Sequence, residues 1–274
     1  VPLLNTGLVN FFGETPADVV SQVKATNFNG LAFKGGTKMY GFDARMSGDV
    51  YTLPAGPLAV AVGTEYRREE ITNNPSAALQ TGDISGYGGA FEAIDKSRNV
   101  WALYAEALIP IVKTVDLNLA VRFDDYSDIG NTTNPKATIR WQPNNQFLGR
   151  ASYSTGFLAP SLQQLFLSQR TGVTAPGTDD PVRCPVTNDS RDCATQFNVL
   201  YGGNPDLKPE ESESWTLGFV FEPAQGASFV VDYFNIKVKD LIIAGFPTET
   251  ILGDPALNYL VQRGAVDPNY PSLP

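Results

Sequence analysis

Several stretches of the chain alternate apolar and polar residues one by one. In residues 57–70, Leu58 and Val60 occupy one parity, whereas Glu65 and Arg67 occupy the other. Successive side chains of a β-strand point to opposite faces, so this pattern predicts strands with one apolar and one polar face. In the last stretch the parity is ambiguous after Tyr233. The predicted strands are 40–52, 57–70, 100–109, 115–125, 136–141, 147–155, 214–221 and 228–238.

The links between these strands alternate between a short and a longer class. Such alternation is typical of an up-and-down antiparallel meander in a membrane, with tight turns on one side and elaborated loops on the other. Many of the strands could supply the roughly 9–11 residues that cross a bilayer at a tilt. We therefore predict an all-β fold, an antiparallel transmembrane β-barrel segment of about eight strands. The links are 53–56, 72–98, 110–114, 126–134, 142–146, 156–212 and 222–226.

A soluble, secreted β-sandwich that binds a ligand is the alternative fold. Its strands also alternate and its loops also vary, but it seldom gives two strict classes of link. Aromatic residues near the strand ends favour the barrel as well, because interfacial girdles lie there. These aromatic residues are Tyr66, Phe123, Tyr126, Trp141, Phe147, Tyr153 and Trp215.

A short helix is predicted in a loop near the start of the chain. Thr15 is the predicted N-cap, Pro16 takes the first helical position, and Val19 and Val23 share one side. Residues 156–166 are expected to hold one further helical turn.

Composition narrows the class of protein and of partner. The 274 residues are 42% hydrophobic, and most of the 25 Gly and 20 Pro lie between the periodic stretches, which favours short elements joined by turns. The net charge of −9 argues against nucleic acid as a partner. No apolar run is long enough for a membrane-spanning helix, so any passage through a membrane must use strands.

Candidate chemistry is sparse. Histidine is absent, which removes the commonest general base and metal ligand, and we expect neither a metal nor a cofactor. Cys184 and Cys193 are separated by a polar turn, which favours a local disulfide and an oxidising compartment. Neighbouring carboxylates such as Glu69 and Glu70 would face opposite ways on a strand, so a carboxylate glycosidase is a remote third hypothesis and no catalytic residue is predicted.

Three segments together resemble a known family. They are "ASYSTGFLAPSLQQLF", "GNPDLKPEESESWTLGF" and "VDYFNIKVKDLI". The chain looks like the barrel of TonB-dependent outer-membrane receptors of Gram-negative bacteria, and further strands extend the similarity over most of it. The most specific family-motif residues are Gly203, Asn204, Pro205, Leu207, Pro209 and Glu210.

The resemblance implies a plugged barrel of about 22 strands that takes up a scarce nutrient. TonB would supply the energy through the plug, and the cargo would be a ferric siderophore or another complex, cobalamin or an oligosaccharide. Residues 1–274 would be an internal part of this barrel, because no plug, TonB-contact motif or C-terminal aromatic strand is seen. Residues 156–212 would form a long extracellular loop that carries the disulfide. The implied partners are outer-membrane lipid, the plug domain, TonB and a small nutrient.

The charged residues on the polar parity are expected to face the barrel interior. We interpret them as plug contacts or as solvated wall rather than as direct contacts to the cargo. Their arginines could attract an anionic ligand, which the acidic loops would oppose. These lumen-facing candidates are Arg45, Glu65, Arg67, Arg122, Asp124, Arg140 and Arg150.

Overall fold

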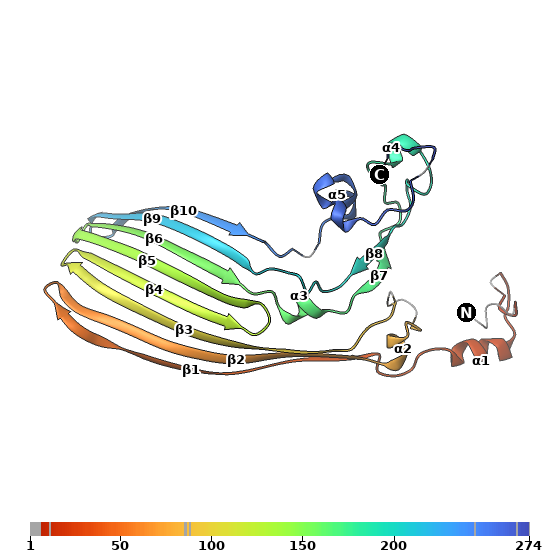
Figure 1. Ribbon diagram of the computed structural model, residues 1–274, viewed down its shortest axis with the longest axis horizontal. Coiled ribbons are helices and arrows are strands. Elements are labelled where there is room, and N and C mark those ends of the chain that lie inside the picture. Colours follow the sequence, from red (N-terminus) through yellow and green to blue (C-terminus); the bar gives the residue numbers. More distant parts are fainter. Residues whose placement is uncertain are drawn as a thin grey trace.

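The computed structural model shows one open, curved sheet of eight antiparallel strands (Figure 1). It describes residues 7–10, 12–84, 87, 89–243, 245–266 and 268–273. Neighbouring strands of the sheet follow one another along the chain, except that β7 and β8 form a separate small ladder within the link between β6 and β9. The prediction of about eight strands in an antiparallel meander is confirmed. The strands of the large sheet are β1 (Phe33–Leu53), β2 (Gly56–Pro75), β3 (Ile94–Val112), β4 (Val115–Tyr126), β5 (Gly130–Asn144), β6 (Phe147–Leu158), β9 (Glu210–Ala224) and β10 (Ala227–Lys239).

The large sheet is a single layer, in contrast to the two packed sheets of a β-sandwich (Figure 1). Side chains of β10 are exposed along its whole length, and those of β1 are exposed up to its last residue. The two faces of the sheet therefore have to be distinguished by side-chain chemistry rather than by burial. The sandwich alternative does not fit this architecture.

The two ends of the sheet differ. Tight turns join the strands at one end, which we call the turn end, whereas helices and longer links lie at the other, the loop end (Figure 1). One predicted long link is wrong, because β5 begins at Gly130 and leaves only residues 127–129 between β4 and β5. The links predicted at 72–98 and 156–212 shrink to 76–93 and 159–209 for the same reason. Backbone pairing continues beyond the apolar part of each strand, because ladder hydrogen bonds do not require apolar side chains.

The remaining elements lie near the loop end. α1 (Ala17–Ala25) confirms the predicted helix, but its N-cap is Pro16. Thr15 is not the cap: its hydroxyl accepts a hydrogen bond from the Asn10 N–H (3.2 Å) and donates one to the Asn10 carbonyl (3.3 Å). No helix in the described ranges is both long and apolar enough to cross a membrane. The other elements are α2 (Ala77–Gln80), α3 (Leu162–Phe166), β7 (Arg170–Val173), α4 (Cys184–Thr187), β8 (Asn198–Tyr201), α5 (Thr248–Gly253) and η2 (Pro255–Leu260).

Buried apolar side chains gather toward the loop end instead of spreading over the sheet. Leu79 of α2, Ile94 at the start of β3, and Leu162 and Leu165 of α3 are all nearly or fully buried. α3 lies against β2 and β3, so the start of the long link is packed onto the wall. This local core also contacts a charged side chain, because the Pro160 carbonyl, just before α3, accepts a hydrogen bond from Arg98.

Candidate functional site

The strand register sorts the sheet into an apolar face and a polar face. Across β2, β3 and β4, Val62 pairs with Ala105 and Ala105 with Val121 on the apolar face. On the polar face, Tyr104 of β3 pairs with Arg122, and Arg122 pairs with Asn134 of β5. The parity predicted for the central strands therefore continues from strand to strand.

Aromatic pairs mark both borders of the apolar face. Tyr66 and Trp101 stack toward the loop end with ring centroids 4.5 Å apart. Trp141 and Phe147 lie near the turn end, with centroids 5.5 Å apart. Tyr126 does not join either border: it is buried, and its hydroxyl accepts a hydrogen bond from Arg67 (3.2 Å) on the polar face. Tyr126 pairs with Val100 and has the parity of Arg122 and Asp124, so it lies on the polar face and not in an aromatic girdle of the apolar face.

A third aromatic pair, Tyr153 and Trp215, lies toward the loop end on β6 and β9. Its ring centroids are 4.4 Å apart, and the two residues face each other across the ladder. Large amphipathic rings are enriched where a membrane meets water. The apolar face thus has the aromatic edges expected of a surface that spans a hydrocarbon layer.

An ionic network occupies the polar face of β2, β3 and β4. Arg67 lies between two carboxylates of its own strand, 3.0 Å from Glu65 and 2.7 Å from Glu69. Arg122 bridges from β4 back to Glu65 at 2.9 Å and holds Asp124 at 2.8 Å. The strand period of two places all five residues on one face, which is why alternate charges in the sequence meet in space.

Arg98 extends the ionic network to the loop end. Its side chain is only 6% exposed, and it contacts Glu69 at 2.7 Å. It also donates to the carbonyl of Pro160 (2.6 Å) and lies over the Tyr126 ring, 5.5 Å from its centroid. Sequence analysis missed Arg98 because it placed this residue in a link, whereas β3 already begins at Ile94.

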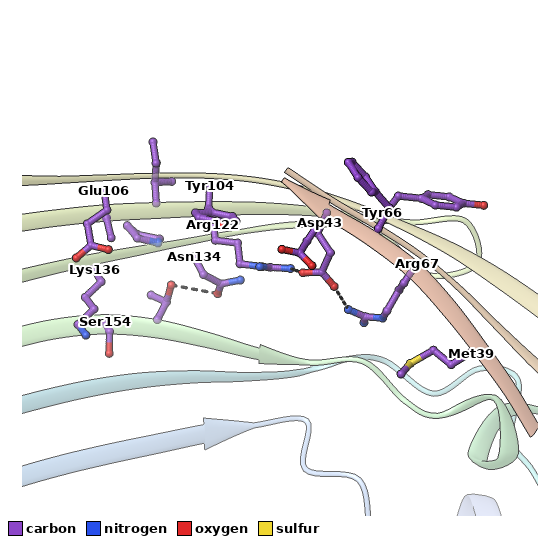
Figure 2. A pocket seen from close by; sticks show the side chains of 18 residues that line it. Met39, Asp43, Tyr66, Arg67, Tyr104, Glu106, Arg122, Asn134, Lys136 and Ser154 are labelled. Atoms are coloured by element: carbon purple, nitrogen blue, oxygen red, sulfur yellow. Dashed lines mark hydrogen bonds and ion pairs between the residues drawn. The ribbon is translucent and has the colours of Figure 1, made fainter. Parts of the chain in front are cut away.

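A hollow of about 750 Å³ lies over the polar face. In Figure 2, Arg122, Asn134 and Lys136 point into the hollow, whereas Tyr66 points away from it. The hollow is lined by charged and hydroxyl groups together with apolar residues such as Met39 and Val121. Most of the arginine charge there is already neutralised by neighbouring carboxylates.

The other predicted charged residues lie on the same parity but form separate contacts. Arg140 pairs with Asp116 at 3.1 Å, and Arg150 pairs with Asp232 at 2.8 Å, both in half-exposed positions. Arg45 lies on the polar parity of β1 and is exposed. The seven candidates therefore form one connected group of four, namely Glu65, Arg67, Arg122 and Asp124, and three outlying positions.

Two of the family-motif residues, Gly203 and Asn204, form backbone hydrogen bonds to the end of α3, and we call these contacts the clasp. Gly203 N–H donates to the carbonyl of Leu167, and Asn204 N–H donates to the carbonyl of Gln164, each at 2.8 Å. A Cβ on Gly203 would lie 2.6 Å from the backbone nitrogen of Leu167, so this close approach requires glycine. Two of the three segments that carry the family resemblance, some forty residues apart in sequence, therefore meet in the structure.

The rest of the motif forms the approach to β9. The Asn204 side-chain oxygen accepts from Asp206 N–H at 2.9 Å, which closes a turn around Pro205. Glu210 is the first residue of β9, and its carboxylate accepts from Ile242 N–H at 2.8 Å. The hydrocarbon side chains of Leu207 and Pro209 are half-buried.

Residues 183–193 of the long link include a loop closed by a single disulfide, and we call them the disulfide knot. The predicted bridge between Cys184 and Cys193 is confirmed. Arg183, directly before the loop that it closes, contacts the buried Asp192 at 2.9 Å, and Thr187 within the loop donates to the same carboxylate at 2.8 Å. The knot thus combines a covalent closure with a largely buried ion pair.

The stability of this knot is expected to depend on pH. Burial raises the pKa of the Asp192 carboxyl, but hydrogen bonds from Arg183 and Thr187 outweigh it and leave the pKa below its usual range. Hydrogen bonds from Arg191 lower the pKa of Asp189 to about 2. Because both folded-state pKa values are depressed, their contribution is complete above the unfolded carboxyl pKa of about 3.9 and is lost as the pH falls below it.

We therefore expect the rate at which the phosphine TCEP reduces the disulfide, divided at each pH by the rate for the urea-denatured protein, to stay constant between neutral pH and about pH 5 and to rise below about pH 4. Asp192→Asn should accelerate reduction at neutral pH and flatten the acid rise. A wild-type rate without any acid rise would show that these carboxylates do not hold the knot.

The described residues do not gather into a site for metal or acid–base chemistry. No group of three or more Cys, Asp or Glu side chains among them is placed to hold a metal ion. The carboxylates of the ionic network are paired with arginines, which suits a structural wall better than proton transfer. What the arrangement can do is separate an apolar surface from a polar, hydrated one.

Residues 6–267 match the family described as TonB dependent receptor-like, beta-barrel. The chain belongs to this family. It is 28% identical over 193 residues to the "Probable TonB-dependent siderophore receptor PirA" of Acinetobacter baumannii, an alignment that covers 69% of this chain and 24% of the relative. It is 25% identical over 204 residues to the heme/hemopexin utilization protein C of Haemophilus influenzae, with 68% of this chain and 25% of that protein covered.

Solved structures show the same fold. The ferric enterobactin receptor of Pseudomonas aeruginosa, in a mutant form with enterobactin, aligns with a TM-score of 0.57 and 19% identity, over 75% of this chain and 27% of the receptor. The siderophore receptor PirA of Acinetobacter baumannii aligns with a TM-score of 0.55 and 22% identity, over 78% of this chain and 29% of PirA. The chain thus spans about a quarter of the length of its curated relatives.

Membership of the TonB-dependent receptor family carries two further conclusions. TonB-dependent receptors are β-barrel proteins of the Gram-negative outer membrane, which places this chain there. They are transporters rather than enzymes.

Proposed function

We propose that this chain forms part of the wall of an outer-membrane receptor barrel. The apolar face, bordered by the aromatic pairs, contacts lipid, and the polar face encloses the interior. Eight strands are too few for the plugged barrels of about 22 strands, so β1 and β10 would pair with further strands. The continuity of the two faces through the strand register supports this proposal most strongly.

The charged residues of the polar face would then stabilise the barrel wall. The ionic network is largely self-neutralised, so it would brace β2, β3 and β4 and present a hydrated surface to a plug domain. Arg45, Arg140 and Arg150 lie outside the ionic network and would meet the plug or solvent. The loop end, with α3 and the disulfide knot, would be the extracellular side, and the tight turns would face the periplasm.

We further propose that the complete receptor uses TonB to take up a ferric siderophore. The observation that carries this proposal is the family match over residues 6–267 together with a relative described as a siderophore receptor. Heme is the second candidate cargo, because another relative is described as a heme/hemopexin utilization protein. Nothing in the ionic network suggests nucleic acid as a partner, since its charges are balanced.

Uptake in a deletion strain tests this assignment. Under iron limitation, the strain should lose accumulation of radioactive iron supplied as a siderophore complex and keep accumulation of iron from heme. Complementation with the intact gene should restore it, and removal of TonB should abolish it again. Loss of heme uptake alone would move the assignment to heme, and unchanged uptake of both would refute an iron-carrying cargo.

A further inference from the structure

Glu210 of the family motif also contacts a second part of the chain, the residues that follow β10. β10 ends at Lys239, and Asp240 adopts a left-handed backbone conformation (φ 53°) that turns the chain out of the sheet. The Ile242 N–H then donates to the Glu210 carboxylate at 2.8 Å. Glu210 therefore joins the base of the long link 159–209 to the start of the segment 240–263, of which the structure describes residues 240–243 and 245–263.

The same two parts of the chain meet again far from this base. Arg263 donates to Asp180 at 2.7 Å, and the Asp180 side chain is only 2% exposed. The other oxygen of Asp180 accepts from the N–H groups of Val182 and Arg183, so the carboxylate is held in place before Arg263 reaches it. A Cβ on Gly253 would lie 3.1 Å from the Pro181 ring, which shows how closely the two parts approach.

Each part is also braced internally. The long link contains the β7–β8 ladder and the disulfide between Cys184 and Cys193, and its base is clasped by Gly203 and Asn204. In the segment 240–263, α5 and η2 are in contact. If the long link and the segment 240–263 were in contact only at Glu210, they could rotate about that point. The second contact, between Asp180 and Arg263, restricts this rotation.

We propose that Gly203, Asn204 and Glu210 are positioning residues that unite the long link and the segment 240–263 into one rigid wall. If the proposed receptor function is right, this wall borders the vestibule through which the cargo enters. The motif then sets the direction in which two extracellular loops leave the barrel. Its role is mechanical, and it serves whichever cargo the receptor takes.

Distance measurements between spin labels test this rigidity in the full-length protein. One label replaces Val186 on the knot and the other replaces Tyr259 on the segment, since both side chains are more than half exposed. A genetically encoded, non-cysteine label leaves the disulfide untouched. Wild type should give one narrow distance peak without any ligand.

Matched variants separate the Glu210 contact from its charge. Glu210→Ala removes the acceptor of Ile242 N–H, and Glu211→Ala removes the same charge from the other face of the strand. Glu210→Gln keeps a carbonyl that can accept the hydrogen bond. Loss of the narrow peak is expected in Glu210→Ala, and its retention is expected in both Glu211→Ala and Glu210→Gln.

Asp180→Asn tests the tip of the wall. It keeps an oxygen for the local N–H groups but loses the charge that faces Arg263, and it too should lose the narrow peak. A broad distribution in wild type, or an unchanged peak in both Glu210→Ala and Asp180→Asn, would overturn the proposal.

Hydrogen exchange of the wild-type protein gives an independent check if a variant fails to fold. The amides of Gly203, Asn204 and Ile242 should be protected together, and exchange as fast as in an open loop would contradict the rigid wall. Neither measurement uses a ligand. Narrow distances with no iron uptake would therefore refute the proposed function alone, whereas normal uptake with broad distances would refute the rigid wall alone.

Discussion

Glu69→Ala is expected to destabilise the barrel wall by about 3 kcal/mol, because it leaves a buried arginine without its closest carboxylate. Arg98 is 6% exposed, and its other acidic neighbour, Asp128, is 3.8 Å away. Removing one partner of a buried ion pair lowers the free energy of unfolding more than removing both, because it leaves a buried charge without a counter-charge. Replacing both residues, as in Glu69→Leu with Arg98→Met, should therefore recover part of the loss.

Glu70→Ala is the matched control for this effect. Glu70 is the next residue on β2, and it pairs with Arg68 on the opposite face, where both side chains are about a third exposed. Such pairs contribute about 0–1 kcal/mol. Urea unfolding of the full-length protein in detergent, followed by heat-modifiable gel mobility, measures both variants, and equal small losses would contradict the structural role of the ionic network.

Gly203→Ala is expected to detach the base of the long link. Its Cβ would lie 2.6 Å from the Leu167 nitrogen and 2.8 Å from the Leu165 carbonyl, and both are backbone atoms that cannot rotate away. Overpacking of this kind costs about 1–3 kcal/mol. When opening is fast relative to cleavage, 2 kcal/mol should raise the rate of proteolysis within residues 159–209 roughly 30-fold.

Gly264→Ala provides the control for Gly203→Ala. A Cβ there would meet nothing within 4 Å, and Gly264 follows directly after Arg263 in the segment that the long link contacts. Cleavage of this variant should match that of wild type. If Gly203→Ala were cleaved no faster than Gly264→Ala, the clasp on α3 would be unimportant for the loop.

The alternating pattern predicted the strands well because side-chain parity is a local property of the backbone. Where large apolar residues occupied one parity, as with Leu117, Leu119 and Val121, the predicted strand and its faces are found in the sheet. After Tyr233 the alternation did not show which side chains of β10 share a face, and the pairing of β10 with β9 defines the faces instead. Asn235 lies opposite Trp215, which places Asn235 and Lys237 on the apolar side and Phe234 on the polar side.

The parts that sequence reasoning missed depend on contacts distant in the chain. Arg98 looked like a loop residue, because no apolar alternation marks the start of β3. The pair Asp180 and Arg263 joins positions 83 residues apart, and no local pattern predicts such a contact. The motif residues were singled out by resemblance, but only the structure shows that Gly203 and Glu210 connect two loops.

The central claim is that the apolar face contacts lipid while the polar face encloses the barrel interior. Nitroxide labels placed singly along β4 in the full-length receptor, reconstituted into liposomes, test it most directly. Collision with oxygen, which concentrates in lipid, should be high at Leu117, Leu119 and Val121 and low at Asn118 and Ala120. Equal values along the strand, or the opposite alternation, would contradict the assignment of the two faces.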